Sequence, residues 1–304
     1  MTRGGSAATT VLDRLRPERT VFSVEFSPPR GDEDEQELWR SIRELEQLDP
    51  AFVSVTYGPA GSSRRRTLRT TSRIARETSL LPVAHLTGVG HSADELRQLI
   101  AAHGAEGVHN VLAIRGDPPG DPSAEWVPHP RGIRHADELV RLVRDTGDYT
   151  IGVAAFPHMH PSSPDVDEDT RRVVNKIRTG ADFAISQVFL QADYFLRLRD
   201  RLALRGCHAP LFPGVMPITT PRVLDTFAQL SGVGVPDGIA ERLDPLRQDP
   251  AAFRAEGLQL TTELCERLIA EGVPGIHFFT LNRTRAVREI IQNLGISRGV
   301  LASV

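Results

Sequence analysis

Residues 20–26 read TVFSVEF, and this apolar run stops at Pro28-Pro29. A run of this length without clean alternation is typical of a strand in a parallel sheet, because both faces of such a strand are covered. Its one charged residue is Glu25, close to the carboxyl end of the run. A carboxylate in that setting is either a buried structural group or a group that performs chemistry. The polar residues in the rest of the chain help to distinguish these two interpretations.

Seven more runs of the same kind follow, at residues 51–57, 81–87, 108–116, 149–155, 182–189, 210–216 and 274–280. Patterns with helical spacing lie between them, at residues 38–48, 65–78, 92–100, 136–146, 166–179, 191–205, 250–271 and 283–294. Ser92 and Glu95 make a capping box at one helix start. Strict alternation of strand and helix predicts a parallel sheet, and eight such units over roughly 250 residues match a closed barrel. We therefore predict an α/β fold, a single (β/α)8 TIM barrel.

A doubly wound open sheet is the structural alternative. It fits less well, because no GxGxxG follows the first strand and the eight units do not divide into halves. We expect the barrel to occupy residues 19–304. Residues 1–18 have no apolar segment of the kind found in secretion signals, and we interpret them as a flexible N-terminal tail. The segment SGVGVPDG from residue 231 predicts a loop between additional helices before the last strand.

The bulk composition excludes several classes of protein. The chain has 304 residues, of which 40% are hydrophobic and 25% charged, as in a globular protein. No apolar run approaches the roughly 20 residues that cross a bilayer, so we predict no membrane insertion and a cytoplasmic location. Its two cysteines, Cys207 and Cys265, are too few for a disulfide framework. A net charge of -3 gives no electrostatic footprint for nucleic acid.

Polar residues collect at the predicted carboxyl ends of the strands, which form the active-site face of such a barrel. They are Glu25, Thr56, Tyr57, His85, Thr87, Arg115, Asp117, His158, His160, Gln187, Asn282 and Arg283. Any loop after a strand tends to be polar, which is an ordinary explanation for single members of the set. That explanation is weaker for Glu25, His85 and Gln187, which lie inside apolar runs where an unpaired polar group would cost a few kcal/mol. A buried structural hydrogen bond remains the alternative for each.

Eight short motifs together resemble one family. In chain order they are SVEFSPPR, FVSVTYGPAGSSRRRT, PVAHLTG, VLAIRGDPP, VAAFPHMHP, ISQVFL, PGVMPIT and HFFTLNR. In order and spacing they resemble the bacterial methylenetetrahydrofolate reductases, from about residue 20 to 295. The resemblance implies a (β/α)8 barrel that holds FAD noncovalently. It also implies reduction of 5,10-methylenetetrahydrofolate to 5-methyltetrahydrofolate with NADH or NADPH by ping-pong hydride transfer, which supplies methyl groups for methionine synthesis. Relatives form dimers or tetramers, so a homo-oligomer is implied too.

The family pattern makes Glu25 and Asp117 the catalytic residues. Glu25 would be the general acid that protonates the departing amine as the folate ring opens, and we expect burial to raise its pKa above about 4.3. Asp117, in RGDPP, matches the acidic residue beside the flavin ring, where its charge would lower the flavin potential. The ordinary alternative for Asp117 is a turn residue before Pro118.

The resemblance also implies binding residues. Thr56 and Gln187 match positions that folate and nicotinamide contact in turn, and Arg283 would meet a folate carboxylate. For FAD, the matching positions are Thr56, His85, Arg115, Gly116, Asp117, His135, Ala136, Ala154, His160, Asp169 and Lys176. Arg115 and Lys176 would supply positive charge for the diphosphate, whereas Gly116 and Ala154 would leave room for flat rings.

Three positions depart from the family pattern. Pro221 stands where an aromatic residue usually packs against the substrate, and Thr220-Pro221 is also a plausible helix start. Asn175 replaces a basic residue, and His135 replaces a tyrosine expected near the adenine. If these changes abolish productive stacking, the alternative is a barrel that binds folate or flavin without turnover.

Two further motifs have competing interpretations. The HMH motif at residues 158–160 suggests a metal-dependent barrel hydrolase, but a zinc or iron site needs three or more converging ligands, and we predict no metal. The basic run SSRRRTLR from residue 62 is interpreted as a solvated helix face, with contact to phosphate or to a glutamate tail as the alternative. Nothing in the sequence distinguishes NADH from NADPH.

Overall fold

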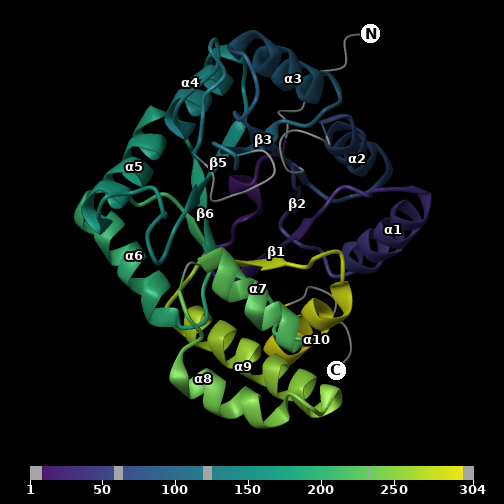
Figure 1. The fold of residues 1–304 in the computed structure, drawn as a ribbon. Coiled ribbons are helices and arrows are strands. Elements are labelled where there is room, and N and C mark those ends of the chain that lie inside the picture. The colour runs from purple at the N-terminus through teal and green to yellow at the C-terminus, as the bar shows by residue number, and fades with distance from the viewer. Residues whose placement is uncertain (1–8, 58–63, 119–124, 232, 297–304) are drawn as a thin grey trace.

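Eight parallel strands close into a barrel in chain order, with β1 paired to both β2 and β8. The computed structural model describes residues 9–57, 64–118, 125–231 and 233–296 (Figure 1). The strands are β1 (Val21–Phe26), β2 (Val53–Val55), β3 (Pro82–Thr87), β4 (Asn110–Ile114), β5 (Thr150–Ala155), β6 (Phe183–Val188), β7 (Leu211–Val215) and β8 (Gly275–Phe279). The predicted TIM barrel is therefore confirmed.

Helices ring the strands on the outside (Figure 1). They are η1 (Leu12–Arg14), α1 (Asp32–Glu46), α2 (Arg64–Glu77), α3 (Ala93–Ala105), α4 (Ala136–Thr146), α5 (Val166–Thr179), α6 (Ala192–Leu204), α7 (Pro221–Ser231), α8 (Asp237–Leu243), η3 (Asp244–Leu246), α9 (Pro250–Ala270) and α10 (Thr284–Leu294). The capping box of Ser92 and Glu95 is present at the start of α3. Between β7 and β8 the chain forms α7, α8 and α9, which confirms the predicted additional helices.

Alternation along β1 explains why an apolar run contains Glu25. Phe22, Val24 and Phe26 belong to the core between the strands and the surrounding helices, and each is at most 1% exposed. The intervening residues therefore face the barrel interior, because successive side chains of a strand point to opposite faces. Ser23 and Glu25 are two of these inward residues. Glu25 sits nearest the carboxyl end, so it reaches the mouth of the barrel.

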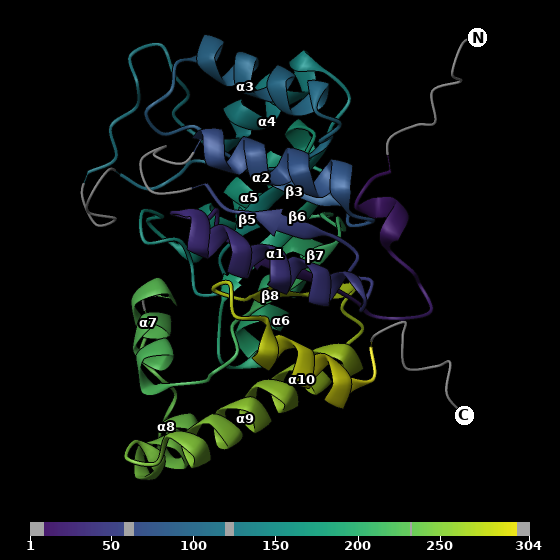
Figure 2. The ribbon, with the colours of Figure 1, turned by 90° about the vertical axis from the view of Figure 1, so that its right-hand side faces the viewer.

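The amino end of the barrel is filled by apolar side chains. Phe52, Phe183 and Phe212 pack there with ring centroids 5.5 to 5.9 Å apart. Val11 is fully buried in the same cluster, and its backbone N–H donates to the side-chain oxygen of Asn110 at 3.0 Å. In Figure 2, η1 lies at the opposite end of the barrel from α7. Val11 therefore packs against the amino end of the barrel, and residues 1–8 of the predicted tail lie outside the described residues.

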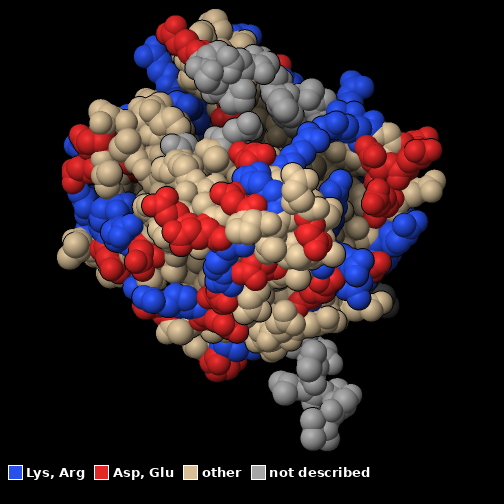
Figure 3. All heavy atoms as spheres, turned by 60° about the horizontal axis from the view of Figure 1, so that its bottom comes forward, with Lys and Arg blue, Asp and Glu red and all other residues tan. Residues whose placement is uncertain are grey.

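The surface carries charges of both signs. On the face shown in Figure 3, acidic and basic side chains are interspersed. Within the described part of the basic run, Arg69 contacts Glu35 on α1 at 3.3 Å, and Arg73, beyond the run on the same helix, contacts that carboxylate at 2.9 Å. Arg69 is therefore part of an ion-paired helix face. Ser62 and Ser63 of that run lie outside the described residues. In the part of the chain that the structure describes, no helix is long and apolar enough to span a membrane.

Candidate active site

The Glu25 carboxylate lies between two imidazoles at the mouth of the barrel. Its Oε2 is 3.3 Å from Nε2 of His85 on β3 and 3.7 Å from Nε2 of His277 on β8. His277 is fully buried, and its Nδ1 lies 2.8 Å from Oγ of Ser23. If Ser23 donates to Nδ1, the neutral imidazole carries its proton on Nε2, facing Glu25. The four side chains thus form one polar cluster, here called the Glu25 cluster, above the apolar filling of the barrel.

The pKa of Glu25 is the first correction to the sequence-based expectations. Burial does raise it, but the contacts with His277 and His85 lower it more, and the result is a pKa of about 2. The expectation that burial would dominate was wrong because it considered the apolar neighbours along β1 and not the imidazoles across the barrel. Burial also lowers the pKa of His277, partly offset by Glu25. At neutral pH these shifts favour an ionised Glu25 carboxylate beside a neutral His277 imidazole.

Two members of the Glu25 cluster were missed from the sequence, Ser23 and His277. The signal for both was available. Ser23 precedes Glu25 by two positions and therefore shares its face of β1, and His277 is a polar residue inside the apolar run GIHFF. The pairing of β1 with β8 places Ser23 opposite His277 and Glu25 opposite Phe279. This pairing exists only because the barrel closes, and the pattern of a single strand does not show which residues of another strand lie beside it.

The turn after β4 holds the Arg115-Gly116-Asp117 segment. Gly116 adopts φ +84°, and a Cβ there would lie 2.6 Å from Val89, so this turn requires glycine. Arg115 is half-buried, and burial lowers its pKa while Asp117 raises it. The Asp117 side chain is exposed. Guanidinium, glycine and carboxylate are thus presented together at the carboxyl end of β4.

A second group of predicted cofactor residues gathers around α5. The Asp169 carboxylate is buried and accepts hydrogen bonds from the backbone N–H of His160 at 3.2 Å and from the hydroxyl of Ser163 at 2.8 Å. The Lys176 ammonium donates to the backbone carbonyl of Ala154 at the end of β5. Burial lowers the pKa of Lys176 to about 8, against the opposing effects of Asp169 and Asp137. The structure therefore brings His160 and Asp169 together, and Lys176 and Ala154 together.

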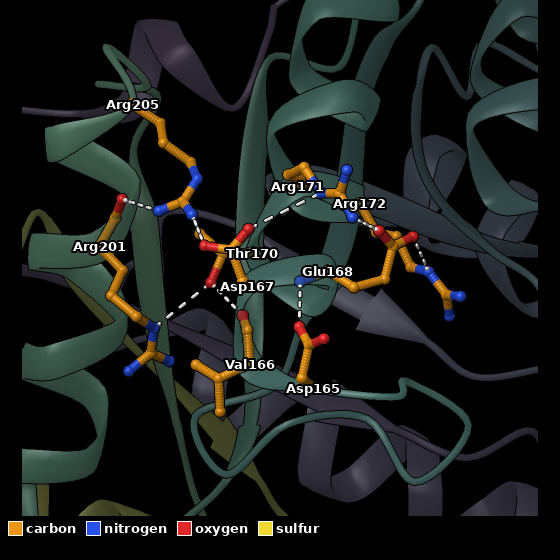
Figure 4. A network of polar contacts seen from close by, with 9 residues as sticks. All are labelled: Asp165, Val166, Asp167, Glu168, Thr170, Arg171, Arg172, Arg201 and Arg205. Atoms are coloured by element: carbon orange, nitrogen blue, oxygen red, sulfur yellow. Dashed lines mark hydrogen bonds and ion pairs between the residues drawn. The ribbon is translucent and has the colours of Figure 1, made fainter.

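A network of polar contacts holds α5 against α6 (Figure 4). Asp165 caps α5 by accepting from the backbone N–H of Glu168 at 2.7 Å. Arg205 of α6 pairs with Asp167, and Arg201 of α6 donates to the hydroxyl of Thr170 at 3.3 Å. These contacts lie on the first turns of the helix that carries Asp169 and Lys176. They fix the helix from outside the barrel, so its inward residues keep their positions.

The remaining predicted residues lie on the same face but do not contact the Glu25 cluster through any hydrogen bond among the described residues. Thr56 follows β2, with its backbone N–H donating to Phe26 at 2.8 Å. The side-chain oxygen of Gln187 accepts from the backbone N–H of Val188 at 2.9 Å, beside an irregularity in the pairing of β6 with β7. His135 is the exposed N-cap residue of α4 and Ala136 begins that helix.

Arg283 is placed by a strained turn after β8. Leu281 and Asn282 both adopt positive φ, 49° and 60°, which is uncommon outside glycine. The Asn282 amide accepts from the backbone N–H of Ser27 at 2.8 Å and donates to the Ser27 carbonyl at 3.0 Å. The turn is thereby fixed to the end of β1. Arg283 follows it as the exposed N-cap of α10, free to meet an anion at the rim.

Unpartnered polar atoms and the available cations test whether a flavin dinucleotide fits this face. Two buried atoms beyond the Glu25 cluster have no hydrogen-bond partner among the described residues: Thr87 Oγ1, at the end of β3, and His158 Nε2, after β5. Buried polar groups without partners are rare in folded proteins, and a bound polar molecule is one explanation. Arg115 and Lys176 supply the charge that suits a diphosphate. The donor set therefore fits FAD.

The HMH motif gives no sign of a metal centre. Ser162 contacts Nδ1 of His160 through its backbone N–H and its hydroxyl, at 3.0 and 2.8 Å. The His158 ring lies 4.1 Å from the Tyr194 ring of α6. Among the residues that the structure describes, no three His, Cys, Asp or Glu side chains converge as metal ligands.

Solved structures with a similar fold include a folate-binding protein and a hydrolase. A protein from Clostridium thermocellum that binds two copies of 5-methyl-5,6,7,8-tetrahydrofolic acid matches with a TM-score of 0.56 at 14% identity, over 93% of this chain and 97% of that one. An oxaloacetate acetylhydrolase matches with a TM-score of 0.55 at 12% identity, over 95% of this chain and 84% of that one. At such low identity the likeness shows the barrel fold alone.

Sequence comparisons are more specific. The family model of methylenetetrahydrofolate reductase matches residues 10–295. The 5,10-methylenetetrahydrofolate reductase of Escherichia coli is 35% identical over 279 residues, which cover 91% of this chain and 92% of that enzyme. Methylenetetrahydrofolate reductase 1 of Schizosaccharomyces pombe is 33% identical over 293 residues, 94% of this chain and 48% of that longer protein. The chain therefore belongs to the methylenetetrahydrofolate reductase family.

Proposed function

We propose that the chain is a flavin-dependent 5,10-methylenetetrahydrofolate reductase that makes 5-methyltetrahydrofolate with NADH or NADPH. The observation that carries the proposal is the Glu25 cluster, a carboxylate between two imidazoles at the barrel mouth in a chain of this family. The proposal includes a cytoplasmic homo-oligomer that supplies methyl groups for methionine synthesis.

FAD, when bound, would accept a hydride from the nicotinamide and pass it to the one-carbon unit. The residues proposed to hold it are those grouped at β4 and α5. The Arg115 guanidinium and the Lys176 ammonium would meet the diphosphate, and the turn at Gly116 would allow a close approach of the ring. Asp117 would place a negative charge beside that ring and so oppose charge build-up on the reduced form.

The Glu25 cluster would manage the proton that folate ring opening requires. In the structure, the carboxylate is favoured by His85 and His277. Separations of 3.3 and 3.7 Å are longer than the roughly 2.7–2.9 Å of a strong charge-assisted hydrogen bond, so these contacts are weak. Further burial under bound ligands would raise the pKa of the Glu25 carboxyl, because burial disfavours the charged form. Covering the mouth would therefore favour uptake of a proton from solvent by Glu25, which could then give it to the departing amine.

The folate and the nicotinamide would use one site in turn. Gln187 suits both, since an amide can donate or accept hydrogen bonds. Arg283 at the rim would meet a folate carboxylate. The Thr220 hydroxyl accepts from the backbone N–H of Val223 at 3.3 Å, so Pro221 is accounted for as the first residue of α7. Another side chain must then contact the aminobenzoate ring, and Phe279, inward on β8 beside Glu25, is our candidate.

Anaerobic half-reactions test the proposal directly. The purified protein should be yellow, bleach on addition of NADH or NADPH, and regain its colour when 5,10-methylenetetrahydrofolate is added. A protein that bleaches but is not reoxidised by the folate would indicate flavin binding without turnover. A colourless protein that takes up no FAD would contradict the proposal outright.

A further inference from the structure

Trp126 contacts the turn that carries Arg115 and Gly116. Its indole N–H donates to the Gly116 carbonyl at 3.1 Å, and its ring faces the Arg115 guanidinium, whose carbon lies 5.0 Å from the ring centroid. The tryptophan is half-buried and comes from the connection between β4 and α4. Neither the strand pattern nor the family motifs included it. Two separate contacts from one side chain to one short turn indicate a positioning role.

The stretch around Trp126 is itself anchored. The Arg131 carbonyl accepts from the backbone N–H of Ala93 at 2.8 Å, and Ile133 is only 5% exposed. Ile133 packs closely against Gly88, where an added Cβ would lie 2.3 Å from its Cδ1. These contacts attach residues 131–133 to the loop after β3. Trp126 is therefore connected to a part of the chain with fixed contacts.

The contact with Trp126 leaves the donors of Arg115 free. A guanidinium that faces an aromatic ring uses its flat side, and its five N–H groups point outward in the plane. Within the described residues, the Arg115 side chain makes no hydrogen bond and no ion pair, while its backbone carbonyl accepts from the Val89 N–H at 2.9 Å. Trp126 therefore orients the guanidinium without consuming the groups that would bind phosphate.

The hydrogen bond to Gly116 also orients the next peptide group. The peptide bond is trans and planar, so the Asp117 N–H points away from the Gly116 carbonyl. With that carbonyl directed at the indole, the Asp117 N–H faces the opposite side of the turn. The Asp117 N–H makes no hydrogen bond to another described residue. Trp126 thus orients two groups, the backbone N–H of Asp117 and the guanidinium of Arg115.

We propose that Trp126 is a positioning residue for FAD, which holds the Arg115 guanidinium and the Gly116–Asp117 peptide in the orientation that receives the cofactor. This inference rests on the proposed function, since it requires that the chain bind FAD. Trp126 has a matched control in Trp39, the only other tryptophan of the chain, which lies on α1 with the Arg73 guanidinium 4.0 Å from its ring centroid. Both tryptophans face an arginine, but only Trp126 contacts the predicted cofactor turn.

The test is the dissociation constant of FAD, measured by titrating FAD-free protein. W39F should bind like the parent. W126F keeps the ring and loses the N–H donor, so binding should weaken roughly 3- to 10-fold. W126L also loses the ring over Arg115, which should weaken binding by roughly another 2- to 5-fold. Thermal unfolding without FAD verifies that each variant is folded, and if W126L is not, W126F decides the question.

A double-mutant comparison separates positioning from general destabilisation. In an Arg115→Gln background there is no guanidinium to orient, so changing W126F to W126L should have no further effect on FAD binding. The loss caused by W126F itself should persist, because it acts through Gly116. Equal FAD affinities of W126L and W39F would overturn the inference. So would a change from W126F to W126L that weakens FAD binding as much in the Arg115→Gln background as it does when Arg115 is present. Failure of the parent to bind FAD would instead overturn the proposed function.

Discussion

Burial and two neighbouring imidazoles shift the pKa of the Glu25 carboxyl in opposite directions. Its burial favours the neutral acid, while His85 and His277 favour the anion and bring the pKa to about 2. A general acid with such a pKa would be ionised at neutral pH, so its proton must return when the site is covered. The chemistry of this residue therefore depends on what lies above it as well as on the strand that carries it.

Replacing Glu25 by glutamine tests its role. The amide keeps the shape and cannot give up a proton, so reoxidation of the reduced protein by methylenetetrahydrofolate should slow by roughly 10²- to 10⁴-fold. Reduction by NADH or NADPH should continue, because no leaving amine is protonated in that step. Stopped-flow absorbance follows both. Equal slowing of the two steps would contradict the assignment.

His277 should control the pH dependence of the folate step. Its contact lowers the pKa of Glu25, so His277→Gln should raise the pKa that governs this step, by roughly one unit. Ser23→Ala should act in the same direction, since it releases the Nδ1 atom that fixes the imidazole tautomer. The rate of methylenetetrahydrofolate reduction is measured between pH 5 and 9 for each variant. A profile unchanged by both substitutions would remove His277 from the proposed proton path, and the NADH step serves as internal control.

The element that matters most for the cofactor region is α5. It begins at the Asp165 cap and is held to α6 through Asp167 and Thr170 (Figure 4). The same helix carries Asp169 and Lys176. Loss of these outer contacts should therefore shift α5 and weaken cofactor binding, although the outer contacts themselves touch no ligand.

Two capping aspartates allow this to be tested. Asp165→Ala and Asp249→Ala each remove an N-cap, of α5 and α9 respectively, and each should lower the free energy of unfolding by roughly 0.5–2 kcal/mol. Urea unfolding measures that loss. Only Asp165→Ala should also weaken FAD binding, because α9 carries none of the predicted cofactor residues. Equal FAD affinity in the two variants would show that the α5 cap has no effect on the site.

The stability of the whole molecule should fall in mild acid, and His103 on α3 is a clear contributor. It is 1% exposed, and burial lowers its pKa from 6.5 to about 4. As the pH falls, His103 therefore binds a proton in the unfolded chain before it does so in the folded chain. The stability that comes from burying the neutral imidazole is present above pH 6.5 and is lost as the pH falls toward 4. Between pH 7 and 5 the loss should be roughly 2 kcal/mol.

The corresponding experiment compares urea unfolding at pH 7 and pH 5. His103→Leu should reduce the difference between the two pH values by about the amount stated, whatever its effect at pH 7. His208→Gln, at an exposed position, serves as the control and should leave the difference unchanged. If the His103 variant shows the parent's pH dependence, the acid sensitivity arises elsewhere.

The architecture was predictable because each strand and helix is encoded locally. Runs such as residues 20–26 and the capped start at Ser92 contain their own signals. The predicted cofactor residues come from the family resemblance, and several of them, such as Arg115 and Ala154, lie at or just after strand ends. What could not be predicted depends on contacts across the barrel. The low pKa of Glu25 comes from His277, the burial of Val11 comes from strands far along the chain, and Trp126 lies in a connection with no periodic pattern.

Pairing of the first strand with the last has a consequence for biosynthesis. Ser23 and Glu25 are made early, whereas His277 is separated from Ser23 by 254 positions and is made much later. A nascent chain still lacking β8 has no partner for the open side of β1 and no second imidazole beside Glu25. The Glu25 cluster therefore cannot be complete before β8 has been made. Competence for this chemistry should arise late and abruptly, when the last strand leaves the ribosome and closes the ring.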